Sequence, residues 1–203
     1  MNARPVIILI IFFSHLYLDK IYAQGDGLYR MATDYYFQGK YQESLQYLDS
    51  AIQLNSEDIS RFFFRSRVHE RLGNYESAIT DLTICIEKSL HDELYLNKRA
   101  ELFELMQQPE MALKDYNTSI RLKSTWEAHY RRGLIFFKLN QLQKALDDLN
   151  RAIELNKYQA DPLRARAYLR LKMDDNEGAC MDMFQVFEMG FDDVRSWLSE
   201  HCG

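Results

Sequence analysis

Apolar and small residues recur along most of the 203-residue chain at intervals of three and four positions. This spacing places apolar side chains on one face of an amphipathic α-helix. The apolar stretches are short, come in pairs and are separated by glycine or polar residues, which indicates helical hairpins. We expect helices at 26–38 with 42–54, 59–72 with 76–88, 93–106 with 110–122, 126–139 with 143–155, and 161–173 with 177–189.

An arginine and an aspartate, 16 residues apart, recur in four of these five hairpins. The pairs are Arg65 with Asp81, Arg99 with Asp115, Arg132 with Asp148, and Arg166 with Asp182. Successive copies lie 34, 33 and 34 residues apart. A unit of about 34 residues is too small to bury its own apolar face, so it must stack on its neighbours. The repeat therefore predicts an all-α solenoid.

The recurring pairs have a structural interpretation. Each arginine falls on the first helix of its hairpin and each aspartate on the second, so a tight turn places the two side chains across the helix interface. An arginine at a packing position is rarely tolerated unless it is paired. We therefore interpret the pairs as structural ion pairs within or between hairpins. The alternative is that the arginines bind anions in a groove.

Shorter elements recur around each pair, of the forms L-G/A-x-x-Y, G-x-Y, A-x-x-x-Y/L and A-I-x-L-N, across residues 25–193. In these elements the units resemble tetratricopeptide repeats. Two positions differ from that family's pattern, because the usual tryptophan near the start of the first helix and the usual proline near the end of the unit are absent. The resemblance implies a right-handed α-solenoid of about five helix-turn-helix units, formed by residues 24–193.

The segment that follows Gly190 reads as one more amphipathic helix, with Val194, Trp197 and Leu198 on one face. We expect it to cover the apolar end of the array, so that residues 194–203 form a capping helix and tail.

Two of the three cysteines flank this cap. Cys180 lies on the last hairpin and Cys202 follows the capping helix. In an oxidising compartment these two residues are expected to form a disulfide that ties the cap to the unit it covers. Cys85 then stays free at a packing position.

Residues 1–23 do not join the repeat. Arg4 precedes an unbroken apolar run from Val6 to Phe13, and a small residue, Ala23, stands at a candidate cleavage site. These features predict a secretory signal that is removed near Ala23, which places the mature protein in the periplasm or outside the cell. The alternative is a membrane anchor, but the apolar run is shorter than the roughly 20 residues that span a bilayer. We expect membrane contact only through the uncleaved signal.

In tetratricopeptide repeats the first helices line the concave side, so the resemblance implies a partner-binding groove there. The candidate groove residues are Tyr29, Thr33, Tyr36, Phe63, Arg67, Asn97, Glu101, Tyr130, Leu134, Arg164 and Tyr168. Aromatic rings give rigid contact area, while asparagine and arginine can hold a peptide backbone or a carboxylate. We therefore expect a protein or peptide partner. Alternatively, some of these rings only fill space between helices.

Other functions are disfavoured by charge and motifs. The net charge of −5 does not suit nucleic acid, whose phosphates need a positive surface. The five histidines never fall at metal-ligand spacing, and the sequence has no Cys-x-x-Cys, no glycine-rich phosphate loop and no nucleophile elbow. We expect no catalysis, no metal, no cofactor and no small-molecule substrate. Two functions remain: an adaptor that binds a peptide of an envelope or secretion partner, or a structural subunit packed permanently in a larger envelope assembly.

Overall fold

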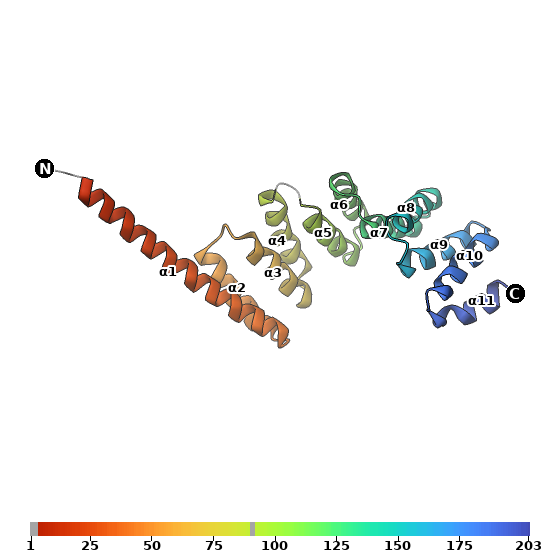
Figure 1. The fold of residues 1–203 in the computed structure, drawn as a ribbon, viewed down its shortest axis with the longest axis horizontal. Helices are drawn as coiled ribbons and strands as arrows, with labels where there is room; N and C mark the ends of the chain where they lie inside the picture. The colour runs from red at the N-terminus through yellow and green to blue at the C-terminus, as the bar shows by residue number, and fades with distance from the viewer. Residues whose placement is uncertain (1–3, 90–91) are drawn as a thin grey trace. The chain divides into compact units, whose positions relative to one another are not determined.

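The computed structural model describes the backbone of residues 4–89 and 92–203, and the side chains of these ranges from residue 20 onward. The described residues are helical and contain no strand (Figure 1). The elements are α1 Arg4–Phe37, α2 Tyr41–Leu54, α3 Ile59–Arg71, α4 Tyr75–Lys88, α5 Glu93–Leu105, α6 Pro109–Leu122, α7 Trp126–Lys138, α8 Leu142–Leu155, α9 Ala160–Lys172, α10 Asn176–Glu188, the 3-10 helix η1 Asp192–Val194 and α11 Arg195–His201. They divide into two compact units, Met1–His91 and Asp92–Gly203, each a stack of helical hairpins.

Helix boundaries agree closely with the sequence pattern. From α2 to α10, every helix begins and ends within one residue of its predicted range. The exception is α1, which ends as expected but begins at Arg4 instead of residue 26. The predicted signal, residues 1–23, lies partly outside the described part of the chain, since residues 1–3 and the side chains before residue 20 are not described. None of the helices that are described is long and apolar enough to cross a membrane.

Every hairpin turns through one residue in the left-handed conformation. Gly39 and Gly73 take this place in the first two hairpins, both with φ of +76°. The other three hairpins use residues with side chains: Gln107 at φ 57°, Asn140 at φ 58° and Asp174 at φ 62°. In each case the next amide bonds back to a carbonyl five residues earlier, as in the Gln108 N–H to Phe103 C=O bond of 2.8 Å. This is the helix-ending arrangement that favours glycine.

One apolar cluster of the first unit lies between α1, α2 and α3 and contains Ala32, Tyr36, Leu48, Phe64 and Val68, while α4 buries Ala78, Leu82, Cys85 and Ile86. One charged side chain is buried near this core.

This side chain is Arg61 on α3, which is 1% exposed. It donates to the Ala51 carbonyl on α2 at 2.6 Å, to Asp58 at 2.9 Å and to Asp26 on α1 at 2.7 Å. A buried guanidinium is tolerated because these acceptors replace its water. Arg61 therefore fastens the three helices together.

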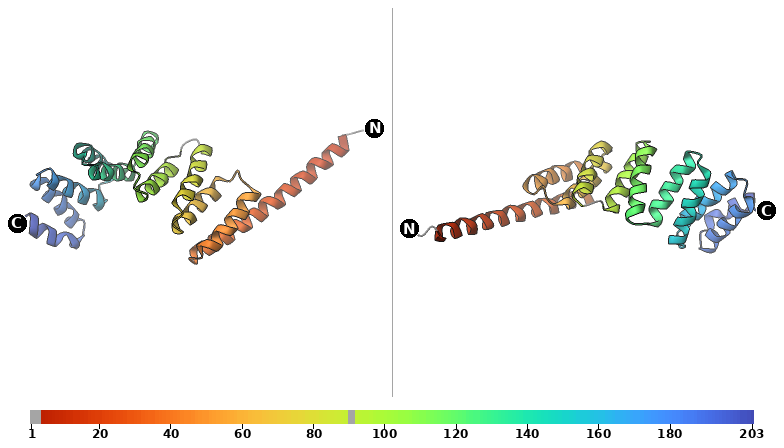
Figure 2. Two further views of the ribbon diagram at one scale, coloured as in Figure 1. Left: turned by 180° about the vertical axis from the view of Figure 1, so that it is seen from behind. Right: turned by 90° about the horizontal axis from the view of Figure 1, so that it is seen from above.

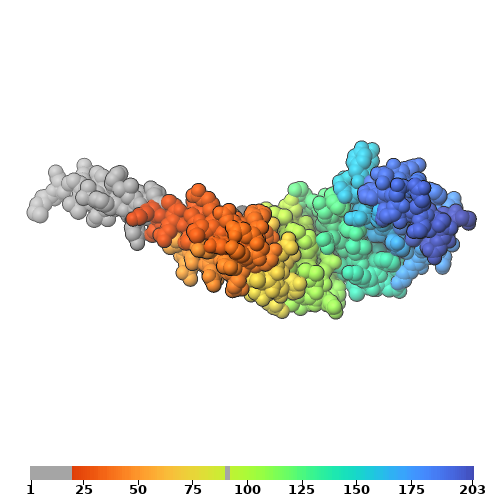
Figure 3. Space-filling view, turned by 90° about the horizontal axis from the view of Figure 1, so that it is seen from below, coloured from red at the N-terminus to blue at the C-terminus, as the bar shows by residue number. Residues whose placement is uncertain are grey.

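The C-terminal cap completes the core of the second unit. Val194 of η1 and Leu198 of α11 are buried against Leu163 on α9 and Met183 on α10. Cys180 on α10 and Cys202 are joined by a disulfide. Figure 2 shows α11 lying beside the α9 and α10 pair, and Figure 3 shows the C-terminal residues, in blue, covering that end of the unit. Apolar surface that the last hairpin would otherwise expose is thus covered.

Candidate functional site

All four arginine–aspartate pairs lie across the two helices of a single hairpin. In each pair, Nε and Nη2 of the arginine donate to the two carboxylate oxygens over 2.6 to 3.0 Å. The aspartate side chains are 2 to 6% exposed and the arginine side chains 15 to 20%. Two parallel bonds to a desolvated carboxylate make a strong, orientation-specific contact.

The arginines also reach a second acceptor, which the sequence analysis missed. Nη1 donates from Arg65 to Asp49 at 2.7 Å, from Arg132 to Asn117 at 2.7 Å, and from Arg166 to Asn150 at 2.6 Å. Each acceptor lies on the second helix of the preceding hairpin. These three arginines therefore bind within their own hairpin and also to the one before it. With their nitrogen donors engaged in this way, we interpret these arginines as structural ties.

Two of the four carboxylates have a further partner: Asp182 lies 2.9 Å from Nη1 of Arg170, and Asp148 contacts a histidine. Oδ1 of Asp148 accepts from Arg132 and also lies 2.9 Å from Nδ1 of the buried His129. Nε2 of the same histidine lies 2.9 Å from Ser124 Oγ. Burial acts to raise the pKa of Asp148, but the hydrogen bonds from Arg132 and His129 outweigh it and lower the pKa. A serine–histidine–aspartate chain of this kind can activate a serine. Here Arg132 already neutralises the carboxylate, so we interpret the chain as structural support for the start of α7.

In the first unit, the predicted groove residue Arg67 lies over two aromatic side chains of the core. Its guanidinium carbon lies 5.3 Å from the centre of the Tyr36 ring and 5.5 Å from that of Phe64, which is cation–π distance. Tyr29 packs edge-on against Phe64 at 5.6 Å, and burial raises the pKa of its hydroxyl. Phe63 and Thr33 are half-buried.

Tyr36 is the groove residue whose predicted place differs most from the structure. It is 8% exposed and belongs to the core of the first unit. Its ring packs against Tyr41 and Phe64, and its hydroxyl accepts a hydrogen bond from Arg71 at 3.3 Å. Tyr36 therefore fills space between helices, which was the alternative for some of the aromatic residues.

In the second unit, Asn97 and Glu101 line a hollow of about 330 Å³. Glu101 accepts a hydrogen bond from Lys98 at 2.8 Å and lies 3.8 Å from Nε of Arg131. The Asn97 side-chain oxygen is buried and has no hydrogen-bond partner among the described residues. Tyr130 and Leu134, on α7, are half-buried and pack against the core of their unit.

The last two groove residues contact the chain's own cap. Arg164 donates to both oxygens of Asp193, at 2.6 and 2.9 Å, and its guanidinium carbon lies 5.2 Å from the centre of the Phe191 ring. Tyr168 packs edge-on against Trp197 at 6.1 Å. The sequence pattern predicted the cap but not its contacts with these two side chains. A partner that binds here must share them with the cap.

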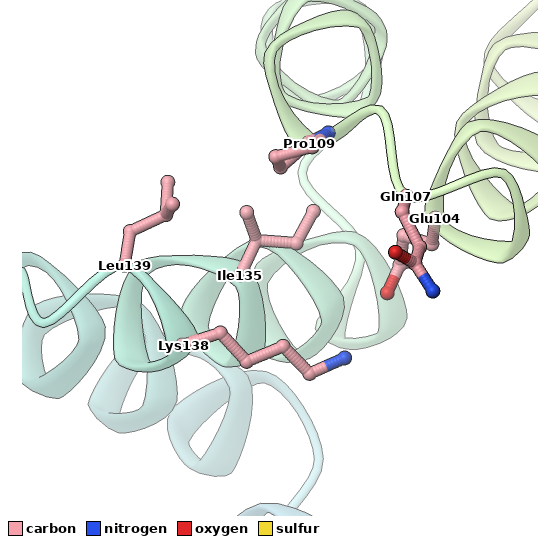
Figure 4. Close-up of a pocket in the computed structure, with 6 residues that line it drawn as sticks. All are labelled: Glu104, Gln107, Pro109, Ile135, Lys138 and Leu139. Atoms are coloured by element: carbon pink, nitrogen blue, oxygen red, sulfur yellow. The ribbon is translucent and has the colours of Figure 1, made fainter.

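A pocket that the sequence analysis did not anticipate lies on the same unit. It has a volume of about 230 Å³ and is lined by Glu104, Gln107, Pro109, Ile135, Lys138 and Leu139. Figure 4 shows Pro109, Ile135 and Leu139 as its apolar side, with Gln107 and Glu104 opposite and Lys138 running below Ile135. Among the described residues, no group of three or more histidine, cysteine, aspartate or glutamate side chains is placed to hold a metal ion.

Gln107 occupies a strained position at this pocket. Its φ of 57° is left-handed, a conformation that costs a residue with a side chain roughly 1–2 kcal/mol. The equivalent residues of the first two hairpins are glycines, which adopt it freely. This substitution alone does not locate the pocket in the sequence, because Asn140 and Asp174 also stand at turn positions that suit glycine.

Cys85, the free thiol, is buried on α4. Burial, and after it the charge of Asp81, raise the pKa of this thiol to about 12. Because the thiolate is the reactive form, we expect Ellman's reagent at pH 8 to modify Cys85 in the folded protein more than about a hundredfold more slowly than after denaturation. The rate is followed by absorbance, with urea-denatured protein as the control. Equal rates in the two states would contradict the buried position.

The chain is similar in sequence to tetratricopeptide-repeat proteins. The tetratricopeptide-repeat family matches residues 29–83 and 126–158. The Hsp70-Hsp90 organising protein of Plasmodium falciparum is 26% identical over 71% of this chain and 25% of its own length. Tetratricopeptide repeat protein 16 of Mus musculus is 26% identical over 86% of this chain and 25% of its own length. The chain thus spans about a quarter of the length of these curated relatives.

Solved structures agree in fold. MamA from Desulfovibrio magneticus RS-1 has a TM-score of 0.74 at 17% identity, over 82% of this chain and 94% of that chain. A tetratricopeptide repeat protein from Parabacteroides merdae has a TM-score of 0.75 at 21% identity, over 83% of this chain and 68% of that chain. YrrB, described as having an unusual peptide-binding site, has a TM-score of 0.68 at 15% identity, over 85% of this chain and 90% of that chain. The chain thus carries tetratricopeptide-repeat matches over residues 29–83 and 126–158, and its helical fold is that of solved tetratricopeptide-repeat structures.

Proposed function

We propose that this protein is an exported, non-enzymatic adaptor that holds a peptide segment of a cell-envelope or secretion partner on the first-helix faces of its hairpins. The observation that carries the proposal is the pocket beside Gln107, which combines apolar walls with polar groups. Such a combination is typical of sites that anchor one side chain of a ligand and fix its orientation. The repeats support a protein-interaction role, because tetratricopeptide-repeat proteins are generally interaction modules and not enzymes.

Two similar proteins add support for a peptide as the ligand. The organising protein of P. falciparum is named for the two chaperones that it organises, and YrrB is described by its peptide-binding site. The envelope location rests on the predicted signal at residues 1–23.

Site-specific photo-cross-linking tests the adaptor function. A photoreactive amino acid replaces Leu139, at the pocket, and the full-length chain is expressed in its native cells. We expect one discrete cross-linked product, identified by mass spectrometry of the envelope fraction. The matched control places the same group at Lys114, on the second helix α6 and outside this pocket. Equal products from both positions, or none from Leu139, would refute the pocket as a partner site.

Export is tested separately from peptide binding, by locating the N-terminus of the mature protein. We expect the protein from the envelope fraction to begin at or near Gln24, as measured by the mass of its N-terminal peptide. A chain that retains Met1 and stays with the cytosolic fraction would contradict export but would leave peptide binding intact.

One observation favours the second candidate, a structural subunit of an envelope assembly. On α10, Met181 is 59% exposed and Phe184 is 49% exposed, which leaves apolar area on the second helix of the last hairpin. Contiguous exposed apolar area often marks a permanent contact. A protein that is insoluble alone, and that remains soluble only when it is co-purified with the same partner, would favour this function over the adaptor.

A further inference from the structure

We propose that the pocket beside Gln107 takes one large aliphatic or aromatic side chain that is followed in the partner by an acidic residue, and that Gln107 is a specificity-determining contact. This inference deepens the proposed peptide-binding function and rests on it. It commits to a partner segment of the type leucine–aspartate, lying across α5 and α7.

The apolar half of the pocket selects the first side chain. Ile135 is buried at its base, Pro109 is half-buried, and Leu139 is partly exposed at the edge. The three side chains come from the start of α6 and the end of α7. Together they line the pocket of about 230 Å³. Burying an apolar side chain there removes both its surface and the pocket's surface from water.

The charged groups at the rim select the second side chain. Glu104 already accepts a hydrogen bond from the Tyr116 hydroxyl at 2.7 Å and lies 3.8 Å from Nη1 of Arg131. Lys138, by contrast, is exposed and forms no ion pair with any residue that the structure describes. The charged group that remains available to a ligand is therefore the Lys138 ammonium, and a carboxylate complements its positive charge.

The strain at Gln107 supports a role for its side chain. Gln107, Asn140 and Asp174 all keep a side chain where a glycine would remove the left-handed penalty, and of these three residues Gln107 lines the pocket. Backbone strain held at a concave site is a reason to look for function there. The amide of Gln107 can donate to and accept from a peptide backbone, which fixes the register of the two selected residues.

The ligand chemistry is tested with a synthetic peptide that carries leucine–aspartate at the centre of a glycine–serine sequence and a fluorescein label. Binding to the full chain is measured by fluorescence polarisation up to about 1 mM protein. We expect saturable binding, weakened by tenfold or more when the leucine is replaced by alanine or the aspartate by lysine. Absence of binding, or equal binding of all three peptides, would overturn the proposal.

Two variants separate function from stability. Gln107→Gly and Asp174→Gly both relieve a left-handed residue with a side chain, but Asp174 is exposed and does not line the pocket. We expect both to raise the melting temperature, by about 2–4 °C. Only Gln107→Gly should weaken peptide binding, by about fivefold, which corresponds to the loss of one hydrogen bond. Unchanged binding by Gln107→Gly would refute the assigned contact.

The outcomes also distinguish this inference from the function on which it rests. A discrete cross-link from position 139 without binding of the leucine–aspartate peptide would overturn the proposed ligand chemistry alone. Loss of both the cross-link and peptide binding would overturn the adaptor function as well.

Discussion

Asp148→Ala is expected to lower the free energy of unfolding of the 92–203 unit by about 3 kcal/mol. Removing the carboxylate leaves Nδ1 of the buried His129 without its partner, and it removes the acceptor of two Arg132 donors. Breaking a buried ion pair costs about 3–5 kcal/mol. We expect the lower end of this range, because the Arg132 side chain is 20% exposed and can regain some water.

The measurement is urea denaturation followed by circular dichroism at neutral pH. Asp147→Ala is the matched control, since Asp147 is the adjacent residue, is exposed, and accepts only a 3.0 Å hydrogen bond from Gln143. It should change stability by less than about 0.5 kcal/mol. Equal stability of Asp148→Ala and the unsubstituted protein would mean that the pairs are not structural ties.

Acidification should abolish the difference in unfolding free energy between Asp148→Ala and the unsubstituted protein. The pKa of Asp148 is lowered in the folded protein, so its contribution is present above the unfolded value of about 4 and is lost as pH falls through the lower folded value. The penalty of Asp148→Ala is therefore expected to shrink progressively below about pH 4. A penalty that stays constant into strong acid would show that the variant acts by leaving a cavity and not by removing the ion pair.

The helices could be predicted from the sequence because each hairpin repeats the same local signals. Apolar residues at helical spacing set the faces, and a turn residue ends every first helix, so α2 to α10 fall within one residue of expectation. The arginine–aspartate pairs were visible because 16 residues is a fixed distance around one hairpin. The second acceptors, Asp49, Asn117 and Asn150, precede their arginines by 16, 15 and 16 residues, and they were not recognised because both their residue type and their spacing vary.

The binding surface was harder to predict because it depends on which of several possible neighbours a side chain finds. Tyr36 has the pattern of an exposed first-helix residue but turns into the core, where Phe64 and Tyr41 surround it. Arg164 and Tyr168 are at groove positions, but the cap supplies them with an aspartate and a tryptophan. The start of α1 was also missed, because residues 1–23 were set apart as a signal, whereas the helix runs without interruption from Arg4 through Gly25 and Gly27.

Protein purified from an oxidising compartment without reductant is expected to show one reactive thiol per chain after denaturation, that of Cys85. Cys180 and Cys202 are joined across a sequence separation of 22 residues. Closing a loop of that length removes conformational freedom from the unfolded chain, and the stabilisation is about 3 kcal/mol in the chain-entropy account. Three reactive thiols would show that the bridge does not form.

Reduction should therefore weaken the second unit. We expect a reductant to lower the melting temperature of the unsubstituted protein by several degrees, because the cap is then held only by noncovalent contacts such as those of Val194 and Leu198. The double variant Cys180→Ala, Cys202→Ala is the control. Its melting temperature should equal that of the reduced protein and should not change when reductant is added. If reduction leaves the melting temperature of the unsubstituted protein unchanged, apolar packing alone secures the cap and the disulfide contributes no stability.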